Sequence, residues 1–185
     1  MRLADNEVSM TKRLFPFLVL LCGILMPLAS GASEWPSPLE ATDPAAEVPD
    51  IQFNGEAGQI INLSSLRGKV VILNIWATWC GPCVKKMPAL DGLATYAEAL
   101  GLAIIPLSVD RGGAAQVRDF YSRTGIKNLA VYTDMNKDVA RHLRPRGLPL
   151  TLILDRQGRE VARVYGPVEW TSEPVLNALR QAAGF

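Results

Sequence analysis

Residues 79–83 read WCGPC, and this stretch decides which fold the chain is expected to adopt. It contains Cys80 and Cys83, two of the three cysteines of the chain. A disulfide that spans two residues restrains little of the entropy of the unfolded chain. A zinc site needs about four ligands, and the chain adds one histidine, His142. We therefore favour a redox-active dithiol, with Cu(I) binding by the two thiolates as an open alternative.

The cysteine pair lies where a predicted strand ends and a predicted helix begins. Residues 70–76, VVILNIW, form a short apolar run rich in β-branched side chains, which is typical of a buried strand. Helical spacing follows from residue 81 to about residue 100, with one apolar face formed by Val84, Met87, Leu90, Leu93 and Ala97. The positive N-terminus of a helix favours a thiolate over a thiol. We therefore expect the pKa of Cys80 to lie below its ordinary value of about 8.5, and Cys83 to be more shielded.

The segments around this unit alternate between strand and helix patterns. Strands are predicted at residues 51–53, 59–62, 102–110 and 128–134, and a hairpin at 150–155 and 159–166 around the turn DRQG. Helical segments are predicted at residues 63–66, 114–123, 136–143 and 171–183. This order predicts an α/β fold, in which helices flank a central mixed β-sheet.

The N-terminal region divides into two further parts. Lys12 and Arg13 precede an apolar run over residues 14–29, and small residues follow directly. We assign residues 1–32 to a signal peptide or an N-terminal membrane anchor on this pattern. Residues 33–49 are rich in proline and acidic residues, without Lys or Arg, and are predicted to form an extended, solvated tether. The folded domain is then expected to occupy residues 50–185.

Composition and export narrow the classes of function. The formal net charge is +1 over 185 residues, and without a basic run we expect no nucleic-acid partner. Export places the domain in an oxidising compartment. We expect the periplasm, with the protein either soluble after signal cleavage or tethered to the inner membrane by residues 14–29.

Three stretches resemble the thioredoxin fold, and in particular its exported TlpA-like branch. Residues 74–88, NIWATWCGPCVKKMP, resemble the thioredoxin active-site segment, with Pro88 as its helix-kinking proline. Residues 146–161, RGLPLTLILDRQGREV, resemble the segment with the cis-proline of the family, here Pro149. The opening of the domain is similar to that of TlpA-like proteins and their peroxiredoxin cousins. The resemblance covers about residues 48–185 and implies a thioredoxin-like fold with an N-terminal strand extension and an insertion between sheet strands.

The resemblance also implies roles for individual residues. Cys80 is expected to be the nucleophile and Cys83 the resolving cysteine of a thiol-disulfide oxidoreductase. Substrate-binding residues carried over from the family are Trp79, Gly81, Pro82, Leu148 and Pro149. The main chain of Leu148 is expected to pair with an incoming peptide as an added strand.

One position departs from the family pattern. Asn74 stands where thioredoxins carry a buried aspartate that takes a proton from the second cysteine. An amide has no such role, so we interpret Asn74 as a hydrogen-bonded polar residue inside a strand. Water, Glu56 or Asp110 stay open as proton acceptors.

The expected function is reduction of disulfides in client proteins, such as apocytochrome c or copper-handling oxidase-assembly proteins. A membrane thiol reductase is the implied electron donor, and we expect a monomer without metal or cofactor. A disulfide oxidant or isomerase and a Cu(I) metallochaperone are the rival functions. Arg141, Arg144 and Arg146 form a basic cluster, interpreted as a solvated face or as a surface that steers an acidic partner.

Overall fold

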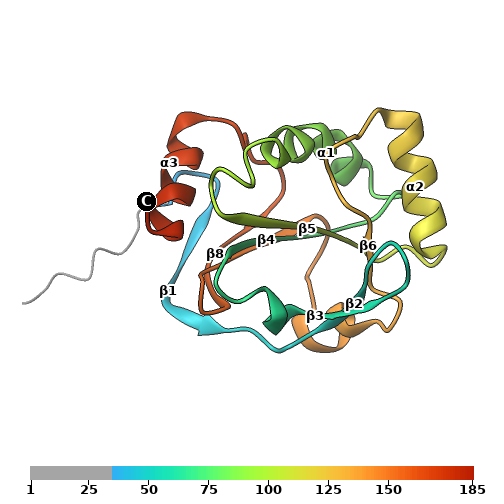
Figure 1. The fold of residues 1–185 in the computed structure, drawn as a ribbon, viewed down its shortest axis with the longest axis horizontal. Helices are drawn as coiled ribbons and strands as arrows, with labels where there is room; N and C mark the ends of the chain where they lie inside the picture. Colours follow the sequence, from blue (N-terminus) through green and yellow to red (C-terminus); the bar gives the residue numbers. More distant parts are fainter. Residues whose placement is uncertain (1–34) are drawn as a thin grey trace, which may run out of the picture. The chain divides into compact units, whose positions relative to one another are not determined.

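The computed structural model describes residues 35–185, which build one eight-stranded sheet (Figure 1). The strands are β1 (Glu40–Glu47), β2 (Gln52–Asn54), β3 (Ile60–Asn62), β4 (Val70–Trp76), β5 (Leu102–Ser108), β6 (Tyr132–Thr133), β7 (Leu150–Leu154) and β8 (Arg159–Tyr165). The helices are α1 (Gly81–Ala94), α2 (Gly113–Thr124) and α3 (Glu173–Ala183), with a 3₁₀ turn η1 (Leu63–Leu66) and a π turn η2 (Val139–Leu143).

The sheet is mixed, as predicted. Its strand order is β1-β8-β7-β4-β5-β6-β2-β3. The β4–β5 and β5–β6 pairs are parallel, and the remaining pairs are antiparallel. The segment between β5 and β7 contains α2, β6 and η2, and β2 and β3 form the predicted N-terminal strand extension.

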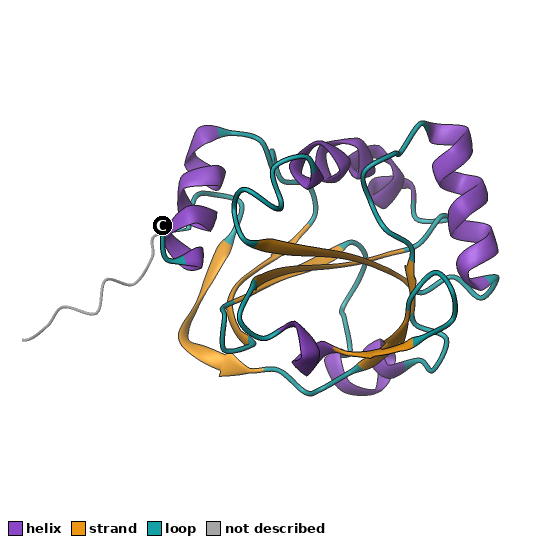
Figure 2. Ribbon diagram, viewed as in Figure 1, coloured by secondary structure: helices purple, strands orange, loops and turns teal. Residues whose placement is uncertain are grey.

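Strand β4 lies in the middle of the sheet and is buried along its whole length. Its side chains alternate between the two faces of the sheet. Ile72 and Trp76 join an apolar cluster with α1, α2 and α3, whereas Leu73 and Ile75 join a second cluster with β2, η1 and η2. Figure 2 shows the three α-helices on one side of the sheet and both short helical turns on the other. Asn74 shares the α1 side of the strand because it alternates with Leu73 and Ile75.

The α1 helix is shorter than the sequence pattern predicts. It ends at Ala94 rather than near residue 100. Beyond it the N–H groups of Thr95, Tyr96 and Ala97 donate to carbonyl oxygens three residues back. These tighter turns take the place of the helical ladder and return the chain to the sheet at β5.

Strand β6 is also shorter than predicted, with two residues instead of the range 128–134. Its end is set by Asp134, whose carboxylate accepts the N–H groups of Asp138 and Val139 at 2.7 and 3.1 Å. These bonds turn the chain into η2. The carboxylate of Asp138 in turn accepts the N–H of Gln52 at 2.9 Å, which ties η2 to the start of β2.

The prediction of a solvated tether over residues 33–49 is wrong for the part that the structure describes. Residues 40–47 form β1, which pairs antiparallel with β8 at one edge of the sheet. Before this strand, Trp35 and Leu39 are buried in the cluster shared with the α-helices, at 8% and 5% exposure. The folded domain therefore includes residues well before position 50.

The register of β1 on β8 places acidic residues opposite basic ones. Glu40 lies opposite Arg163 of β8, and Glu47 lies opposite Arg159. Opposite charges at facing positions stabilise a strand pair. The Thr42 hydroxyl also donates to Glu160 at 2.7 Å. Two of the acidic residues that suggested a solvated segment thus face arginines of β8, whose guanidinium groups pair with Asp155 and Glu160.

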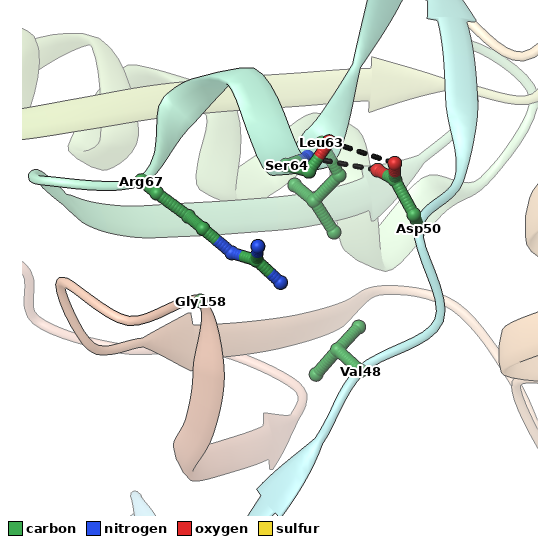
Figure 3. Close-up of a pocket in the computed structure, with 6 residues that line it drawn as sticks. All are labelled: Val48, Asp50, Leu63, Ser64, Arg67 and Gly158. Atoms are coloured by element: carbon green, nitrogen blue, oxygen red, sulfur yellow. Dashed lines mark hydrogen bonds between the residues drawn. The ribbon is translucent and has the colours of Figure 1, made fainter.

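The connection from β1 to β2 is held against η1 (Figure 3). The carboxylate of Asp50 accepts the backbone N–H of Ser64 at 2.8 Å and its hydroxyl at 2.7 Å. Val48, Arg67 and Gly158 line the same small pocket, so this connection contacts both η1 and the β7–β8 turn. The pocket volume of about 20 Å³ suits a water molecule or two rather than a ligand.

The predicted signal peptide or anchor at residues 1–32 lies outside the described residues. Within residues 35–185, the structure contains no helix long and apolar enough to cross a membrane.

Candidate active site

The two cysteines lie at the junction of β4 and α1. Cys80 is the N-cap of α1, and Pro82 occupies the first helical turn, where no backbone N–H donor is required. Cys80 and Cys83 form a disulfide with their Cα atoms 5.2 Å apart. The Cys80 sulfur also accepts the N–H of Cys83 at 3.2 Å. One sulfur therefore receives both a backbone donor and the positive end of the helix, which favours the thiolate when the disulfide is reduced.

Access to the two cysteines differs. Cys80 is 6% exposed and Cys83 is 1% exposed. Trp79, directly before the pair, is 70% exposed. A Cβ atom on Gly81 would meet no other atom within 4 Å, so the space in front of the pair is open.

A surface groove begins beside the pair and runs along the start of β7. It is lined by Pro82, Arg146, Gly147, Leu148, Pro149, Tyr165 and Gly166, and its volume is about 380 Å³. The Leu148–Pro149 peptide bond is cis, as the resemblance implied. Leu148 precedes β7, and its main chain makes no hydrogen bond to other residues in the range 35–185. It can therefore accept an extended segment from outside the chain.

The predicted substrate-binding residues fall into two groups. Pro82, Leu148 and Pro149 line this groove together. Trp79 and Gly81 flank the cysteines without lining it.

The loop that carries Trp79 is fixed by a carboxylate. Asp110, 2% exposed, accepts the backbone N–H of Thr78 at 2.8 Å and its hydroxyl at 2.9 Å. Ser108 and Gln116 donate to the same carboxylate at 2.7 and 3.0 Å. Four donors leave this carboxylate engaged, so Asp110 acts as a positioning residue for the loop before Cys80.

Behind Cys83 lies a small cavity of about 10 Å³, roughly the size of one water molecule. Its lining consists of Asn74, Cys83, Lys86, Met87, Leu90, Pro149 and Gly166. The Asn74 amide donates to the hydroxyl of Thr151 at 2.8 Å, which agrees with its interpretation as a hydrogen-bonded strand residue. Neither Glu56 nor Asp110 lines this cavity, and Lys86 is its one charged side chain.

The three arginines in and directly after η2 are not equivalent. Arg141 pairs with the carboxylate of Asp138, and Arg144 donates to the carbonyl oxygen of Arg141 at 3.3 Å. Arg146 lines the groove. His142 is exposed on η2. In residues 35–185, no three His, Cys, Asp or Glu side chains are grouped to hold a metal ion.

Comparison with known proteins places this site in a family. The family model described as Redoxin matches residues 43–179. The chain belongs to the redoxin family. This redoxin is 32% identical over 135 residues to the thiol-disulfide oxidoreductase ResA of Bacillus thuringiensis, covering 73% of this chain and 76% of the relative. With its Cys-x-x-Cys pair, it is a thiol-disulfide oxidoreductase that works by dithiol–disulfide exchange.

Solved structures support the thioredoxin-like fold of this redoxin. A secreted thiol-disulfide isomerase from Corynebacterium glutamicum is 26% identical, with a TM-score of 0.65 over 82% of this chain and 98% of the other. The exposed lipoprotein thioredoxin of Streptococcus pneumoniae is 25% identical, with a TM-score of 0.60 over 72% and 99%.

Sequence reasoning missed several residues around the cysteines. Tyr165 and Gly166 come from the end of β8, and only the folded chain brings them to the site. Lys86 lies one helical turn after Cys83 on α1, a spacing that could have indicated it. Asp110 was considered as a proton acceptor, whereas in the structure its carboxylate accepts hydrogen bonds from Thr78 and holds the loop before Cys80. The hydrogen bonds between Thr78 and Asp110 could not be predicted from local sequence, because 32 residues separate the two partners.

Proposed function

We propose that this redoxin reduces disulfides of client proteins outside the cytoplasm. The observation that carries this proposal is the position of Cys80. Its sulfur lies at the N-cap of α1, beside an open groove with an unpaired main chain at Leu148. Clients such as apocytochrome c or copper-handling oxidase-assembly proteins, and a membrane thiol reductase as electron donor, belong to the same proposal.

The exchange takes two steps. The Cys80 thiolate attacks one sulfur of the client disulfide, a Cys80–client bond forms, and the other client sulfur leaves as a thiolate that takes a proton from water. Cys83 then loses its proton and attacks the Cys80 sulfur. The Cys80–Cys83 bond forms and the second client sulfur leaves. Two electrons have passed to the client, and the donor reductase restores the dithiol.

Client binding would use the groove. An extended segment can pair with the free main chain of Leu148 as an added strand, which brings its sulfur toward Cys80. Pro82 and Pro149 would then contact its side chains. The open space in front of Gly81 leaves room for the approaching sulfur.

Two observations support a location outside the cytoplasm and the reducing direction. The apolar run at residues 14–29 follows Lys12 and Arg13 in the order of an export signal, and one similar structure is of a secreted protein. The Gly-Pro pair between the cysteines resembles that of reducing members of the fold. A monomer belongs to the same proposal, and a site built within one chain supports it.

Reduction of insulin by the pre-reduced protein tests the proposal. We expect Cys80→Ser to abolish insulin reduction and Cys83→Ser to accumulate a mixed disulfide between Cys80 and the client. A reduction potential near about −270 mV is expected for a reductase, whereas about −120 mV would reverse the proposed direction. Full activity of Cys80→Ser would exclude this cysteine as the nucleophile.

Isomerisation is a second candidate, because the similar structure from Corynebacterium glutamicum is of a thiol-disulfide isomerase. An isomerase needs attack and release by Cys80 but no net transfer of electrons. The Cys83→Ser variant separates the two functions, since it would still reactivate a scrambled protein substrate if isomerisation were the main activity. A Cu(I) metallochaperone would instead retain Cu(I) through both thiolates and leave insulin oxidised.

A further inference from the structure

We propose that the groove beside Cys80 selects client segments with an acidic residue next to the reactive cysteine, and that Arg146 provides this selectivity. The inference rests on the proposed reduction of client disulfides and names the chemistry of the preferred client.

Arg146 is the one charged residue that lines the groove. The rest of its lining is apolar or uncharged, and no carboxylate lines it. The Arg146 guanidinium has no ion pair or hydrogen bond to any residue in the range 35–185. It is exposed, so its charge is available to a bound segment.

The backbone of Arg146 also contacts another residue of the groove. Its backbone N–H donates to the hydroxyl of Tyr165 at 3.4 Å, and Tyr165 lines the same groove. Arg141 is occupied by Asp138, and Arg144 donates to a carbonyl oxygen outside the groove. Of these three arginines, only Arg146 combines a place in the groove with an unpaired guanidinium.

The surrounding charges favour the same sign of ligand. The first turn of α1 contains no acidic residue and presents its positive end at Cys80. Lys85 and Lys86 follow on the same helix. A client segment along Leu148 would pass between this helix end and Arg146. A carboxylate beside its cysteine would gain from both, whereas a lysine there would be repelled.

Synthetic peptides test the inference directly. Each carries one cysteine as a mixed disulfide with 2-mercaptoethanol, flanked on both sides by Asp, Asn or Lys. The reduced full-length protein is mixed with each peptide, and release of the peptide thiol is followed by chromatography after acid quenching. Rates are divided by those with dithiothreitol, which removes the intrinsic effect of the flanking charge on the disulfide.

We expect the Asp peptide to react about two to five times faster than the Asn peptide, the range of an exposed ion pair, and the Lys peptide to react most slowly. About 0.5 M NaCl should remove most of the difference. Arg146→Gln should bring the three rates together, because the charge that distinguishes the peptides is then gone. Arg144→Gln removes the same charge two residues away, outside the groove, and should keep the preference.

Equal rates for the three peptides with the parent protein would overturn the inference. So would a preference that survives Arg146→Gln, or one that Arg144→Gln removes to the same degree, since the general charge of the loop would then be responsible. Failure to reduce any of the peptides would instead count against the proposed function, so the two failures are distinguishable.

Discussion

At the scale of single residues, the surroundings of Cys83 are unusual for a redox dithiol of this fold. Asn74, which carries an amide, and the basic residue Lys86 line the cavity beside it, and no carboxylate does. Lys86 lies three residues after Cys83 on α1, so the two side chains share one side of the helix. A cation beside a thiol favours its thiolate, which is the form that attacks. We therefore expect Lys86 to favour the attacking form of Cys83 without accepting its proton.

Replacing Lys86 by Met tests this role. Reaction with a coloured aromatic disulfide releases one thiolate when Cys80 attacks and a second when Cys83 resolves the mixed disulfide. We expect Lys86→Met to slow the second release at pH 7 and to move its pH midpoint upward by about half to one unit, since removal of a nearby cation disfavours the thiolate. Lys85→Met, on the exposed neighbour, is the control. An equal shift in both variants would show that the general charge of α1 is responsible.

The sequence could predict the reacting atoms of the site but not their surroundings. Cys80, Cys83 and Pro149 lie in local motifs, so their positions follow from short stretches of chain. Arg146 and Tyr165 contact each other across 19 residues, and nothing near either residue indicates the partner. Such contacts depend on strand order and register, which local patterns do not specify.

At the scale of elements, predictions were accurate where periodicity was strong. The buried strand at 70–76 is confirmed with both its ends, and the hairpin of β7 and β8 forms around the predicted turn. Strand β1 was missed because its signal is not apolar alternation but charges that match Arg159 and Arg163. Pairing of this kind becomes visible only when the partner strand is known.

The burial of Trp35 gives the segment that leads into β1 a measurable effect on stability. Replacement of a buried Trp by Ala removes a large apolar surface and leaves a cavity, which costs about 3 to 5 kcal/mol. We expect Trp35→Ala to lower the free energy of unfolding by that amount in urea titration. Tyr96→Ala, at a position 47% exposed, should cost far less. If both substitutions lowered the free energy of unfolding by a similar, small amount, Trp35 would not be packed in the core. The prediction of a solvated segment at its position would then hold.

At the scale of the whole molecule, Asp138 joins η2 to β2 across 86 residues. The N–H of Gln52, and then the guanidinium of Arg141, lower the pKa of Asp138 below its ordinary value of 3.8. A carboxyl with a lowered pKa in the folded state stabilises the fold above its unfolded pKa, and this contribution disappears as pH falls through the folded pKa.

We therefore expect Asp138→Asn to reduce stability at pH 7 by about 1.5 to 3 kcal/mol, the range for hydrogen bonds to charged groups. The difference from the parent protein should shrink as pH falls below about 4. Urea titrations at pH 7, 5 and 3 measure it, with the exposed Asp119→Asn as control. A difference that stays constant over this range would mean that the charge of Asp138 is not what stabilises the fold.

The pairing of β1 with β8 has one more consequence, for solubility. Strand β8 alternates half-buried and buried residues and would be the last strand of the sheet if β1 were removed. Its unpaired N–H and C=O groups would then offer a template to the next molecule. A chain cut by a protease after residue 47 would keep both cysteines. It would also expose β8 as an unpaired edge strand and tend to self-associate.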